Sequence, residues 1–192
     1  MPDMGYAVEA GAADLAATHL DAICEVYDDT FSRPPFHWRS DESALHRARL
    51  MQLLGDPSFG VVLGRTATDI IGFAYGFTIP ATTKRWDYLL KPLSEETTRE
   101  WNGRTFMLYD FAVAPNARGK GVGRALHHGL LGSRSEARAT LTVQPTALDT
   151  KAIYQHWGWR IVGQMEGGDS AAAPVFDVLL RDSLDDLRQI KR

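Results

Sequence analysis

The stretch that decides the fold is Asp110-Phe111-Ala112-Val113-Ala114-Pro115-Asn116-Ala117-Arg118-Gly119-Lys120-Gly121-Val122-Gly123-Arg124-Ala125-Leu126. It begins as an apolar strand, breaks into a glycine-rich turn and continues as a helix. Its three alternating glycines have no side chains to hold a ligand away from the backbone, so successive N–H groups and the positive helix end can converge on phosphate oxygens. Arg118, Lys120 and Arg124 add positive charge at the same place. The stretch therefore predicts an anion-binding unit.

Spacing separates the phosphate loops that this stretch could form. The dinucleotide fingerprint needs Gly or Ala three residues after the second of two alternating glycines, where this chain has Arg124 or Leu126. The nucleoside-triphosphate loop needs Ser or Thr after its Gly-Lys pair, but Gly119-Lys120 is followed by Gly121. Another alternative is a simple strand-to-helix turn with a solvated basic cap, which has no need of three alternating glycines.

Length and composition predict one folded domain over residues 1–192. Hydrophobic residues make up 44% and charged residues 23%, which is ordinary for a soluble globular protein with a substantial core. A net charge of −3 gives no basic field for nucleic acid and favours, if anything, a cationic substrate. Cys24 is the single cysteine, so we expect no disulfide framework and a reducing, cytoplasmic location.

We expect neither a membrane segment nor a metal site. The first residues lack the basic and apolar regions of a secretory signal, and no segment approaches the roughly 20 apolar residues that span a bilayer. The six histidines show no metal-ligand spacing. His127 and His128, for example, are adjacent on a helix and point to different faces, so solvated or capping histidines are the expectation.

Apolar periodicity and turn residues predict the remaining elements. The long segment 80–104 contains a short helix and is typical of functional or mobile insertions. The order of elements in the second half predicts an α/β (α+β) fold whose mixed sheet has a parallel step at its centre. Helices are expected at about 12–27, 40–54, 94–101, from the glycine turn to 134, at 146–156 and weakly beyond 183, with strands at 6–9, 59–65, 70–79, 105–113, 139–143, 159–165 and 175–180.

Two motifs resemble those of the Gcn5-related N-acetyltransferase (GNAT) superfamily. Arg118-x-x-Gly121-x-Gly123 behind a Val-x-Pro strand end is similar to the family's pyrophosphate loop for acyl-coenzyme A. Tyr154-Gln155-His156-Trp157-Gly158-Trp159 is similar to its Tyr-x-x-x-Gly-aromatic signature, and Leu141-Thr142-Val143 to the strand between the two. The resemblance covers residues 105–163 at motif level and most of the chain in element order.

This resemblance implies a mostly antiparallel sheet of six to seven strands, flanked by about four helices. The sheet would splay into a V between strands 105–113 and 139–143, with acetyl-coenzyme A in the split. Ala147 departs from the family, because many members have an asparagine there that contacts coenzyme A. The implied binding residues are Phe111, Ala112, Val113, Arg118, Gly119, Lys120, Gly121, Val122, Gly123 and Arg124.

The resemblance also implies two catalytic side chains. Asp110 lies where many members carry a glutamate that removes the proton of the amine; Asp is shorter, so we expect it to act through a water. Leu108, Asp110 and Ala112 should share one strand face, and apolar surroundings there would raise the pKa of the carboxyl. The alternative is an aspartate that fixes a bulge or binds an arginine.

Tyr154 lies where many members place the acid that protonates the departing thiolate. The alternative is a tyrosine that packs against Trp157 with its hydroxyl in solvent. The backbone N–H of Val113 is the implied donor to the thioester carbonyl, a role that residue identity barely constrains.

Aromatic residues in two loops are the candidates for the acceptor side, namely Phe36, Trp38, Trp86 and Tyr88. They could enclose an organic amine by stacking or cation–π contact, or they could form a satellite hydrophobic cluster that anchors the loops. We expect transfer from acetyl-coenzyme A to a primary amine of a small molecule, such as an antibiotic or an amino-acid derivative, by a monomer or homodimer. The alternatives are a protein N-terminal or lysine acetyltransferase and a non-catalytic coenzyme A sensor.

Overall fold

The computed structural model describes residues 5–189, which are built around one seven-stranded sheet. The strand order is β1-β2-β3-β4-β5-β7-β6, and every neighbouring pair is antiparallel except β4 and β5. This confirms the predicted mixed sheet with a central parallel step. The strands are β1 (Ala7–Gly11), β2 (Gly60–Arg65), β3 (Ile70–Thr78), β4 (Thr105–Val113), β5 (Arg138–Val143), β6 (Arg160–Glu166) and β7 (Val175–Arg181).

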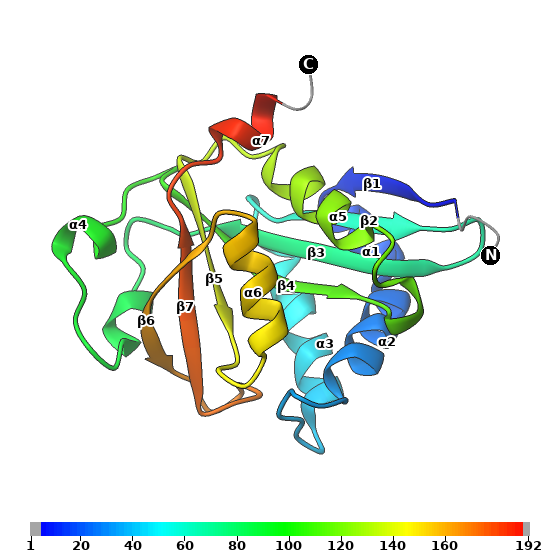
Figure 1. The fold of residues 1–192 in the computed structure, drawn as a ribbon, viewed down its shortest axis with the longest axis horizontal. Helices are drawn as coiled ribbons and strands as arrows, with labels where there is room; N and C mark the ends of the chain where they lie inside the picture. Colours follow the sequence, from blue (N-terminus) through cyan, green and yellow to red (C-terminus); the bar gives the residue numbers. More distant parts are fainter. Residues whose placement is uncertain (1–4, 190–192) are drawn as a thin grey trace.

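Helices cover both faces of the sheet (Figure 1): α5 and α6 lie on one face and α1 to α3 on the other. The helices α3, α5 and α6 correspond to predicted helices, whereas the helix expected at 12–27 is divided at His19 into α1 and α2, and α2 continues to Phe31. None of the helices between residues 5 and 189 is long and apolar enough to cross a bilayer. The helices are α1 (Ala13–Thr18), α2 (Leu20–Phe31), α3 (Glu42–Leu53), α4 (Glu95–Thr98), α5 (Val122–Leu131), α6 (Leu148–His156) and α7 (Asp185–Gln189), with the short 3-10 helices η1 (Arg85–Tyr88) and η2 (Pro115–Ala117).

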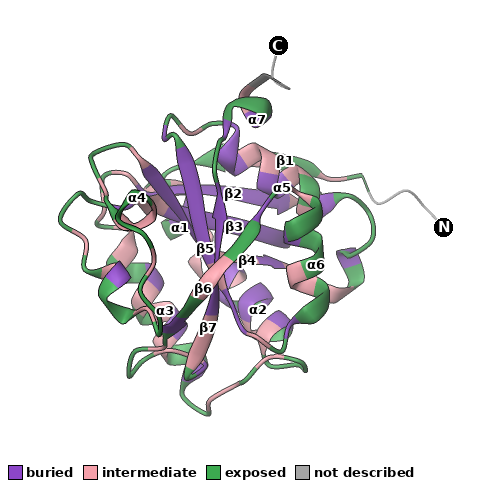
Figure 2. Cartoon of the chain, turned by 60° about the vertical axis from the view of Figure 1, so that its left-hand side comes forward, coloured by how far each residue is buried: buried purple, intermediate pink, exposed green. Residues whose placement is uncertain are grey.

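The two larger apolar clusters of the core lie on opposite faces of the sheet, and a third, smaller cluster forms around Trp86. Leu126 and Leu130 of α5 pack on one face, and Ile23 of α2 and Leu50 of α3 pack on the other. The central strands are therefore buried on both sides, while the edge strand β6 is partly exposed (Figure 2). Burial of both faces explains why β2 and β3 are nearly continuous apolar runs.

The parallel pair β4 and β5 is joined at one end only. Its register comprises Thr105, Phe106 and Met107 opposite Arg138, Ala139 and Thr140. Beyond Met107, β4 continues to Val113 with β3 as its only partner strand. The two strands thus diverge into the V that the sequence predicts, and the inner edge of β4 keeps free backbone groups.

A β-bulge in β4 changes which side chains share a face. Tyr75 of β3 lies opposite Asp110, but the next residue, Gly76, lies opposite Leu108, so Tyr109 is the extra residue. A side chain at Gly76 would collide with the carbonyl of Met107, which explains the glycine there.

The expectation that Leu108, Asp110 and Ala112 share a face is therefore wrong. Leu108 packs beneath α5, whereas Ala112 packs on the α2 side. Asp110 is hydrogen-bonded on that same α2 side, because the inserted residue Tyr109 shifts the alternation of side chains by one position.

Candidate functional site

The glycine-rich turn leads into α5 with free N–H groups pointing outward. Gly119 and Gly121 have φ angles of +74° and +82°, a left-handed conformation that favours glycine. Gly121 is the N-cap of α5, and its carbonyl accepts from Ala125 N at 3.0 Å. The first-turn N–H groups that precede Ala125 consequently have no acceptor within the helix, and together with the helix dipole they favour an anion.

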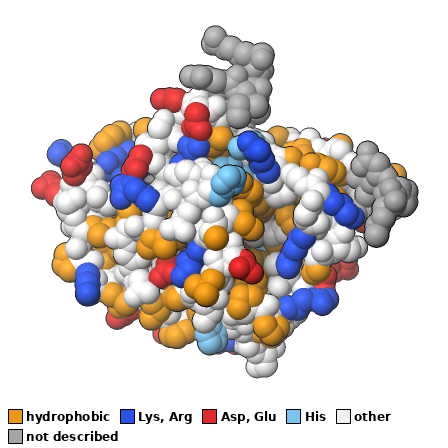
Figure 3. Space-filling view, in the orientation of Figure 1, with side chains coloured by type: hydrophobic (Ala, Val, Ile, Leu, Met, Phe, Trp, Pro, Cys, Tyr) orange, Lys and Arg blue, Asp and Glu red, His pale blue; other side chains and the backbone are white. Residues whose placement is uncertain are grey.

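Exposed cationic side chains surround this turn. Arg118 Nε donates to the carbonyl of Val113 at 3.1 Å, and Lys120 Nζ donates to the carbonyl of Asn116 at 2.9 Å. Arg124 is exposed as well. Both hydrogen bonds go to neutral carbonyls, so the positive charges stay available to a ligand. Figure 3 shows basic side chains gathered near α5 on the face that carries α5 and α6.

The free edge of β4 directs backbone N–H groups into the split. Ala114 N donates to the carbonyl of Ile71 at 2.9 Å, and Val113 is paired with Gly72 one position earlier. In an antiparallel pair, hydrogen-bonded and non-hydrogen-bonded positions alternate, so the N–H of Val113 points away from β3. Its carbonyl points the same way and accepts from Arg118. The geometry thus supports the expected donor role of Val113.

Tyr154 projects from α6 toward the same split. Its ring contacts Phe111 of β4 at a centroid distance of 6.3 Å and packs edge-on against Trp157 and Trp159 at 6.1 and 5.8 Å. Burial, and secondarily the charge of Asp110, raise the pKa of the Tyr154 phenol well above its ordinary value. The phenol therefore keeps its proton at neutral pH and can donate it.

Asp110 is the carboxylate of the split, and its side chain is 17% exposed. The hydroxyl of Tyr75 donates a hydrogen bond to its Oδ2. Burial raises the pKa of Asp110 to about 6, while the bond from Tyr75 and the charge of Arg49 act in the opposite direction. A carboxylate with this pKa is ionised at neutral pH yet basic enough to accept a proton.

Behind Asp110 lies a buried polar network that the sequence did not reveal. His46 Nε2 of α3 is 3.1 Å from the Tyr75 hydroxyl and 3.7 Å from Asp110 Oδ2. Because the single phenol proton of Tyr75 goes to Asp110, His46 Nε2 carries the proton of that second contact. Burial lowers the pKa of His46 to about 3, so the imidazole is neutral.

The network extends from His46 to a buried ion pair through the side chain of Tyr27. The Tyr27 ring stacks on His46 at a centroid distance of 3.5 Å, and its hydroxyl donates to Glu42 Oε1 at 2.9 Å. Arg49 pairs with the same carboxylate. Isolated residues on α2 and α3 gave no sequence signal for this arrangement, and the expectation of solvated or capping histidines is wrong for His46 and His127, both fully buried.

The first acceptor-side loop is attached to the end of β5. His37 N donates to Gln144 Oε1 at 2.7 Å, and Thr146 Oγ1 donates to the carbonyl of Pro35 at 2.8 Å. Trp38 lies 6.2 Å from the Tyr27 ring, and Phe36 packs edge-on against Phe31 at 4.8 Å. Trp38 thus borders the network behind Asp110, whereas Phe36 packs against the apolar cluster beneath α5.

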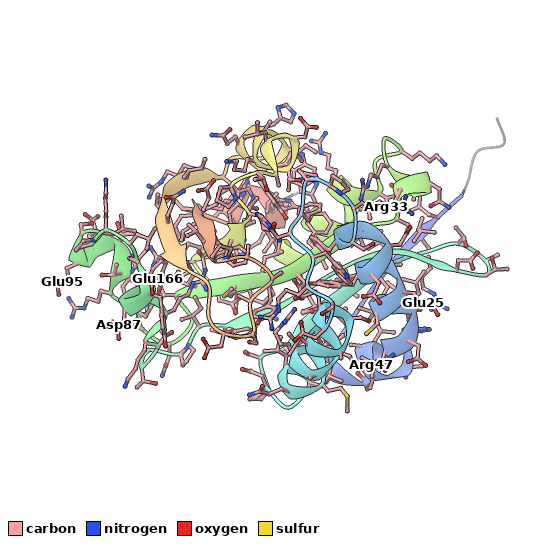
Figure 4. The ribbon with its side chains drawn as sticks, turned by 90° about the horizontal axis from the view of Figure 1, so that it is seen from below. Glu25, Arg33, Arg47, Asp87, Glu95 and Glu166 are labelled. Carbon is pink, nitrogen blue, oxygen red and sulfur yellow. The ribbon has the colours of Figure 1, made fainter. Side chains whose placement is uncertain are left out.

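The second acceptor-side loop places its aromatics differently. Trp86 is buried against Met165, Val178 and Leu180, and its indole N–H donates to Glu100 Oε1 at 3.2 Å. Tyr88 is exposed. Figure 4 shows this segment, with Asp87 and Glu95, on one side of the molecule and α2 and α3, with Glu25 and Arg47, on the other. Substrate contact by Trp86 and Tyr88 stays a prediction, and Trp86 has the surroundings of an anchor.

Within the described part of the chain, no group of three or more His, Cys, Asp or Glu side chains is placed to hold a metal ion. The predicted coenzyme-side residues, in contrast, all belong to the free edge of β4, to the turn that follows it or to the first turn of α5. Asp110 and Val113 thus lie on the part of β4 that does not pair with β5, Tyr154 packs against Phe111 of that part, and the glycine-rich turn follows it.

Comparison with known proteins agrees with this geometry. A model of the acetyltransferase (GNAT) family matches residues 20–159. No curated protein sequence matches the chain.

Several solved structures share the fold. PH1933 from Pyrococcus horikoshii OT3 has a TM-score of 0.64 and 17% identity, over 93% of this chain and 99% of that chain. The ribosomal-protein-S18-alanine N-acetyltransferase from Escherichia coli has a TM-score of 0.57 and 14% identity, over 92% of this chain and 91% of that chain. A GNAT family acetyltransferase from Elizabethkingia anophelis, solved with acetyl-CoA bound, has a TM-score of 0.56 and 12% identity, over 95% and 99%.

Proposed function

The chain belongs to the acetyltransferase (GNAT) family, and from that premise we propose that it transfers the acetyl group of acetyl-CoA to a primary amine of a small molecule. The observation that carries the proposal is that a carboxylate, a buried phenol and an outward-pointing backbone N–H border the same split. Asp110 and Val113 lie on the part of β4 that does not pair with β5, and Tyr154 packs against Phe111 of that part. A domain that only bound coenzyme A would need the glycine-rich turn but not these groups.

The residues present fit acetyl-CoA. The first-turn N–H groups of α5 and the cations Arg118, Lys120 and Arg124 suit a pyrophosphate. A Cβ on Gly123 would lie 3.6 to 3.7 Å from its nearest protein atoms, which is ordinary contact. Protein packing therefore does not require this glycine, whereas close approach of a ligand to the backbone does. When bound, acetyl-CoA supplies the activated acetyl group.

Each protein group has one task in the transfer. Asp110 removes a proton from the ammonium group of the acceptor, directly or through a water, and the resulting neutral amine is the nucleophile. The N–H of Val113 donates to the thioester carbonyl, where negative charge develops. The Tyr154 hydroxyl donates a proton to the leaving sulfur, and its raised pKa keeps that proton in place until it is needed.

Loops over the acceptor side favour a small molecule over a protein substrate. Arg39 Nη1 donates to the carbonyl of Asp169 at 2.6 Å, and Arg49 Nη1 donates to that of Ser170 at 2.9 Å. These bonds hold the β6–β7 loop against α3 and the segment before it, beside Arg49, whose charge acts on Asp110. The S18-alanine N-acetyltransferase has the same fold, and a peptide acceptor is accordingly the main alternative.

A thiol-release assay with acetyl-CoA against a panel of amines and peptides tests the proposal. We expect release with small amines. Asp110→Asn should reduce it most at pH values above about 6, where Asp110 is ionised, and below the pKa of the amine, where the amine carries a proton to be removed. Turnover only with peptides would identify a protein acetyltransferase. Tight coenzyme A binding without release from any acceptor would identify a sensor.

A further inference from the structure

The inner face of α3 carries ionisable side chains where packing alone would require only apolar ones. Its buried residues are Glu42, His46 and Leu50, and both Glu42 and His46 have no exposed surface. A buried polar group costs free energy unless it is hydrogen-bonded, so these two groups need partners. The partner of His46 is the hydroxyl of Tyr75 on β3, which is itself bonded to Asp110 on β4.

Hydrogen-bond geometry assigns each proton in this chain of three groups. Tyr75 has one phenol proton and two neighbours, the carboxylate of Asp110 and, at 3.1 Å, Nε2 of His46. The ionised carboxylate is the stronger acceptor and takes that proton. His46 Nε2 therefore carries a proton and donates it to the Tyr75 oxygen. The opposite tautomer would place two lone pairs face to face and leave a buried N–H at Nδ1, which has no partner within residues 5–189.

The neighbours of the His46 imidazole hold it in this orientation. The Tyr27 ring lies parallel to it, with 3.5 Å between the centroids and 5° between the planes. The Tyr27 hydroxyl is in turn fixed on Glu42 Oε1 at 2.9 Å. Because His46 has no exposed surface, water does not compete for Nε2. A firmly held donor thus faces the Tyr75 oxygen.

The two carboxylate oxygens of Asp110 have different surroundings. Oδ2 accepts from Tyr75 and lies 3.7 Å from His46 Nε2. Oδ1 accepts no hydrogen bond from residues 5–189, and it is not one of the buried side-chain atoms without a partner in that range. The side chain is 17% exposed, so this exposure includes Oδ1. One oxygen is therefore occupied by the protein and the other is open to a substrate.

We infer that His46 is a positioning residue for the proton transfer: its Nε2–H group directs the phenol proton of Tyr75 to Asp110 Oδ2 and leaves Oδ1 to take the proton of the acceptor amine. A hydroxyl that accepts a hydrogen bond is also a stronger donor, because hydrogen bonds in a chain polarise one another. His46 is fully buried and acts only through Tyr75. The inference rests on the proposed function, since it concerns the base of that reaction.

Other groups also act on the charge of Asp110, and a test has to keep them in place. Burial raises its pKa most, the hydrogen bond from Tyr75 and the charge of Arg49 lower it, and the charge of Glu42 raises it. The titratable or charged side chains around Asp110 are Tyr75 from β3, Glu42, His46 and Arg49 from α3, Tyr27 from α2, Tyr109 beside it in β4 and Tyr154 from α6. A variant of His46 that keeps all the others changes only the donor to Tyr75.

Nuclear magnetic resonance on the full chain tests the proton assignment without relying on activity. Nitrogen shifts of isotope-labelled histidine show which ring nitrogen carries the proton, and we expect His46 as the neutral Nε2–H tautomer between about pH 5 and pH 9. Titration of the labelled Asp110 carboxyl carbon, assigned by its loss in Asp110→Asn, gives the pKa of the base. A proton on Nδ1 of His46 would overturn the inference.

Variants of His46 test its effect on the base. His46→Phe keeps a ring for the stack with Tyr27 and removes the donor. The bond from Tyr75 then stabilises the ionised carboxylate less, so the pKa of Asp110 and the acid limb of kcat/KM should rise by about half a pH unit or more. His46→Gln, whose amide nitrogen can take the place of Nε2, should stay near the wild-type value. His127→Phe, which replaces a fully buried histidine of α5 on the opposite face of the sheet, is the matched control and should leave the limb in place.

A double-mutant cycle shows whether His46 acts through Tyr75. In the Tyr75→Phe protein, His46→Phe should no longer move the pKa of Asp110, because the hydroxyl that connects the two groups is gone. An equal shift in both backgrounds would overturn the positioning role in favour of a direct effect of the imidazole on Asp110. Lower stability in His46→Phe without any shift would make His46 a packing residue.

The two readouts separate this inference from the proposed function. A pKa of Asp110 that depends on both His46 and Tyr75, in a protein that releases no thiol with any amine, would overturn the proposed transfer and leave the chain of hydrogen bonds standing. Turnover of amines with an acid limb that neither His46→Phe nor Tyr75→Phe moves would overturn the inference alone.

Discussion

At the scale of single residues, Asp110 is subject to two opposing influences. Burial raises the pKa of its carboxyl, and the hydroxyl of Tyr75 lowers it by donating a hydrogen bond to the ionised form. Burial dominates, so the charge is costly to the folded state. A general base needs such a raised pKa, because a freely solvated aspartate would be too weak a base at neutral pH.

This compromise predicts that Asp110→Asn stabilises the protein above about pH 6. The folded state binds the proton more tightly than the unfolded chain, with a pKa of about 6 against 3.8, so stability is lost as pH rises between these values. Removing the charge should recover up to about 3 kcal/mol at pH 8 and almost nothing below about pH 4. Denaturant unfolding of both proteins at the two pH values measures this difference, and an equal effect at both would contradict it.

Tyr75→Phe should shift the acid limb of the rate profile. Loss of the hydroxyl removes the hydrogen bond that lowers the pKa of Asp110, so that pKa rises above about 6. We expect the rise of kcat/KM with pH to move to higher pH, with the plateau retained. Profiles recorded with two amines of different pKa separate this limb from the titration of the substrate. A loss of activity at every pH, with the limb unmoved, would make Tyr75 a packing residue.

Tyr154→Phe should lower kcat by roughly 10- to 1000-fold and leave acetyl-CoA affinity almost unchanged. The hydroxyl acts on the leaving sulfur, whereas the ring, which the variant keeps, holds the aromatic packing with Phe111, Trp157 and Trp159. Steady-state rates and calorimetric binding check the two parts separately. Turnover near the wild-type rate would mean that water supplies the proton.

At the scale of elements, the limits of sequence reasoning follow from the range of the interactions involved. The glycine-rich turn could be predicted because left-handed glycines, free N–H groups and cations all lie within one short segment. The bulge at Tyr109 could not, because it depends on Gly76 across the strand pair. His46 also gave no signal, since it becomes notable only through its burial and through its contacts with Tyr75 and Tyr27, which are distant in sequence.

The turn before α5 allows fold and ligand binding to be separated. Gly123→Ala places a methyl group in ordinary contact with its neighbours. The higher helix propensity of Ala should raise the free energy of unfolding of the ligand-free protein by up to about 1 kcal/mol, and its melting temperature should rise accordingly. The same methyl should remove most of the stabilisation by acetyl-CoA, because it blocks the approach of the pyrophosphate to the backbone. Thermal melts with and without acetyl-CoA measure both effects.

Gly103→Ala is the matched control for this experiment. Gly103 has a φ of +79°, open space around its Cα, and a position outside the turn. Its substitution should destabilise the protein by about 1 to 2 kcal/mol and leave the acetyl-CoA shift intact. A full shift in Gly123→Ala would place the pyrophosphate elsewhere.

At the scale of the whole molecule, two long loops connect the halves of the split sheet. The segment after α2 is hydrogen-bonded to Gln144 and Thr146 beyond β5, and segment 80–104 packs on β6 and β7 through Trp86. The first attachment lies beyond the end of β5, where β4 and β5 no longer pair. The second lies beside Glu100, which contacts Thr105 and Arg138 at the paired end. The inner edges can therefore keep unpaired N–H groups without the sheet closing.

Hydrogen exchange should reveal what fills this split. In the free protein, residues 105–107 of β4 are paired with strands on both sides, whereas residues 108–113 are paired with β3 alone and should exchange faster. Acetyl-CoA should slow exchange at 108–113 and at 119–124 by about tenfold or more and leave 105–107 unchanged, because only the free edge and the turn gain acceptors. Peptide-level mass spectrometry resolves the three segments. Protection confined to 119–124 would mean that the ligand contacts the turn without entering the split, and Asp110 and Tyr154 would then lie too far from the thioester to act on it.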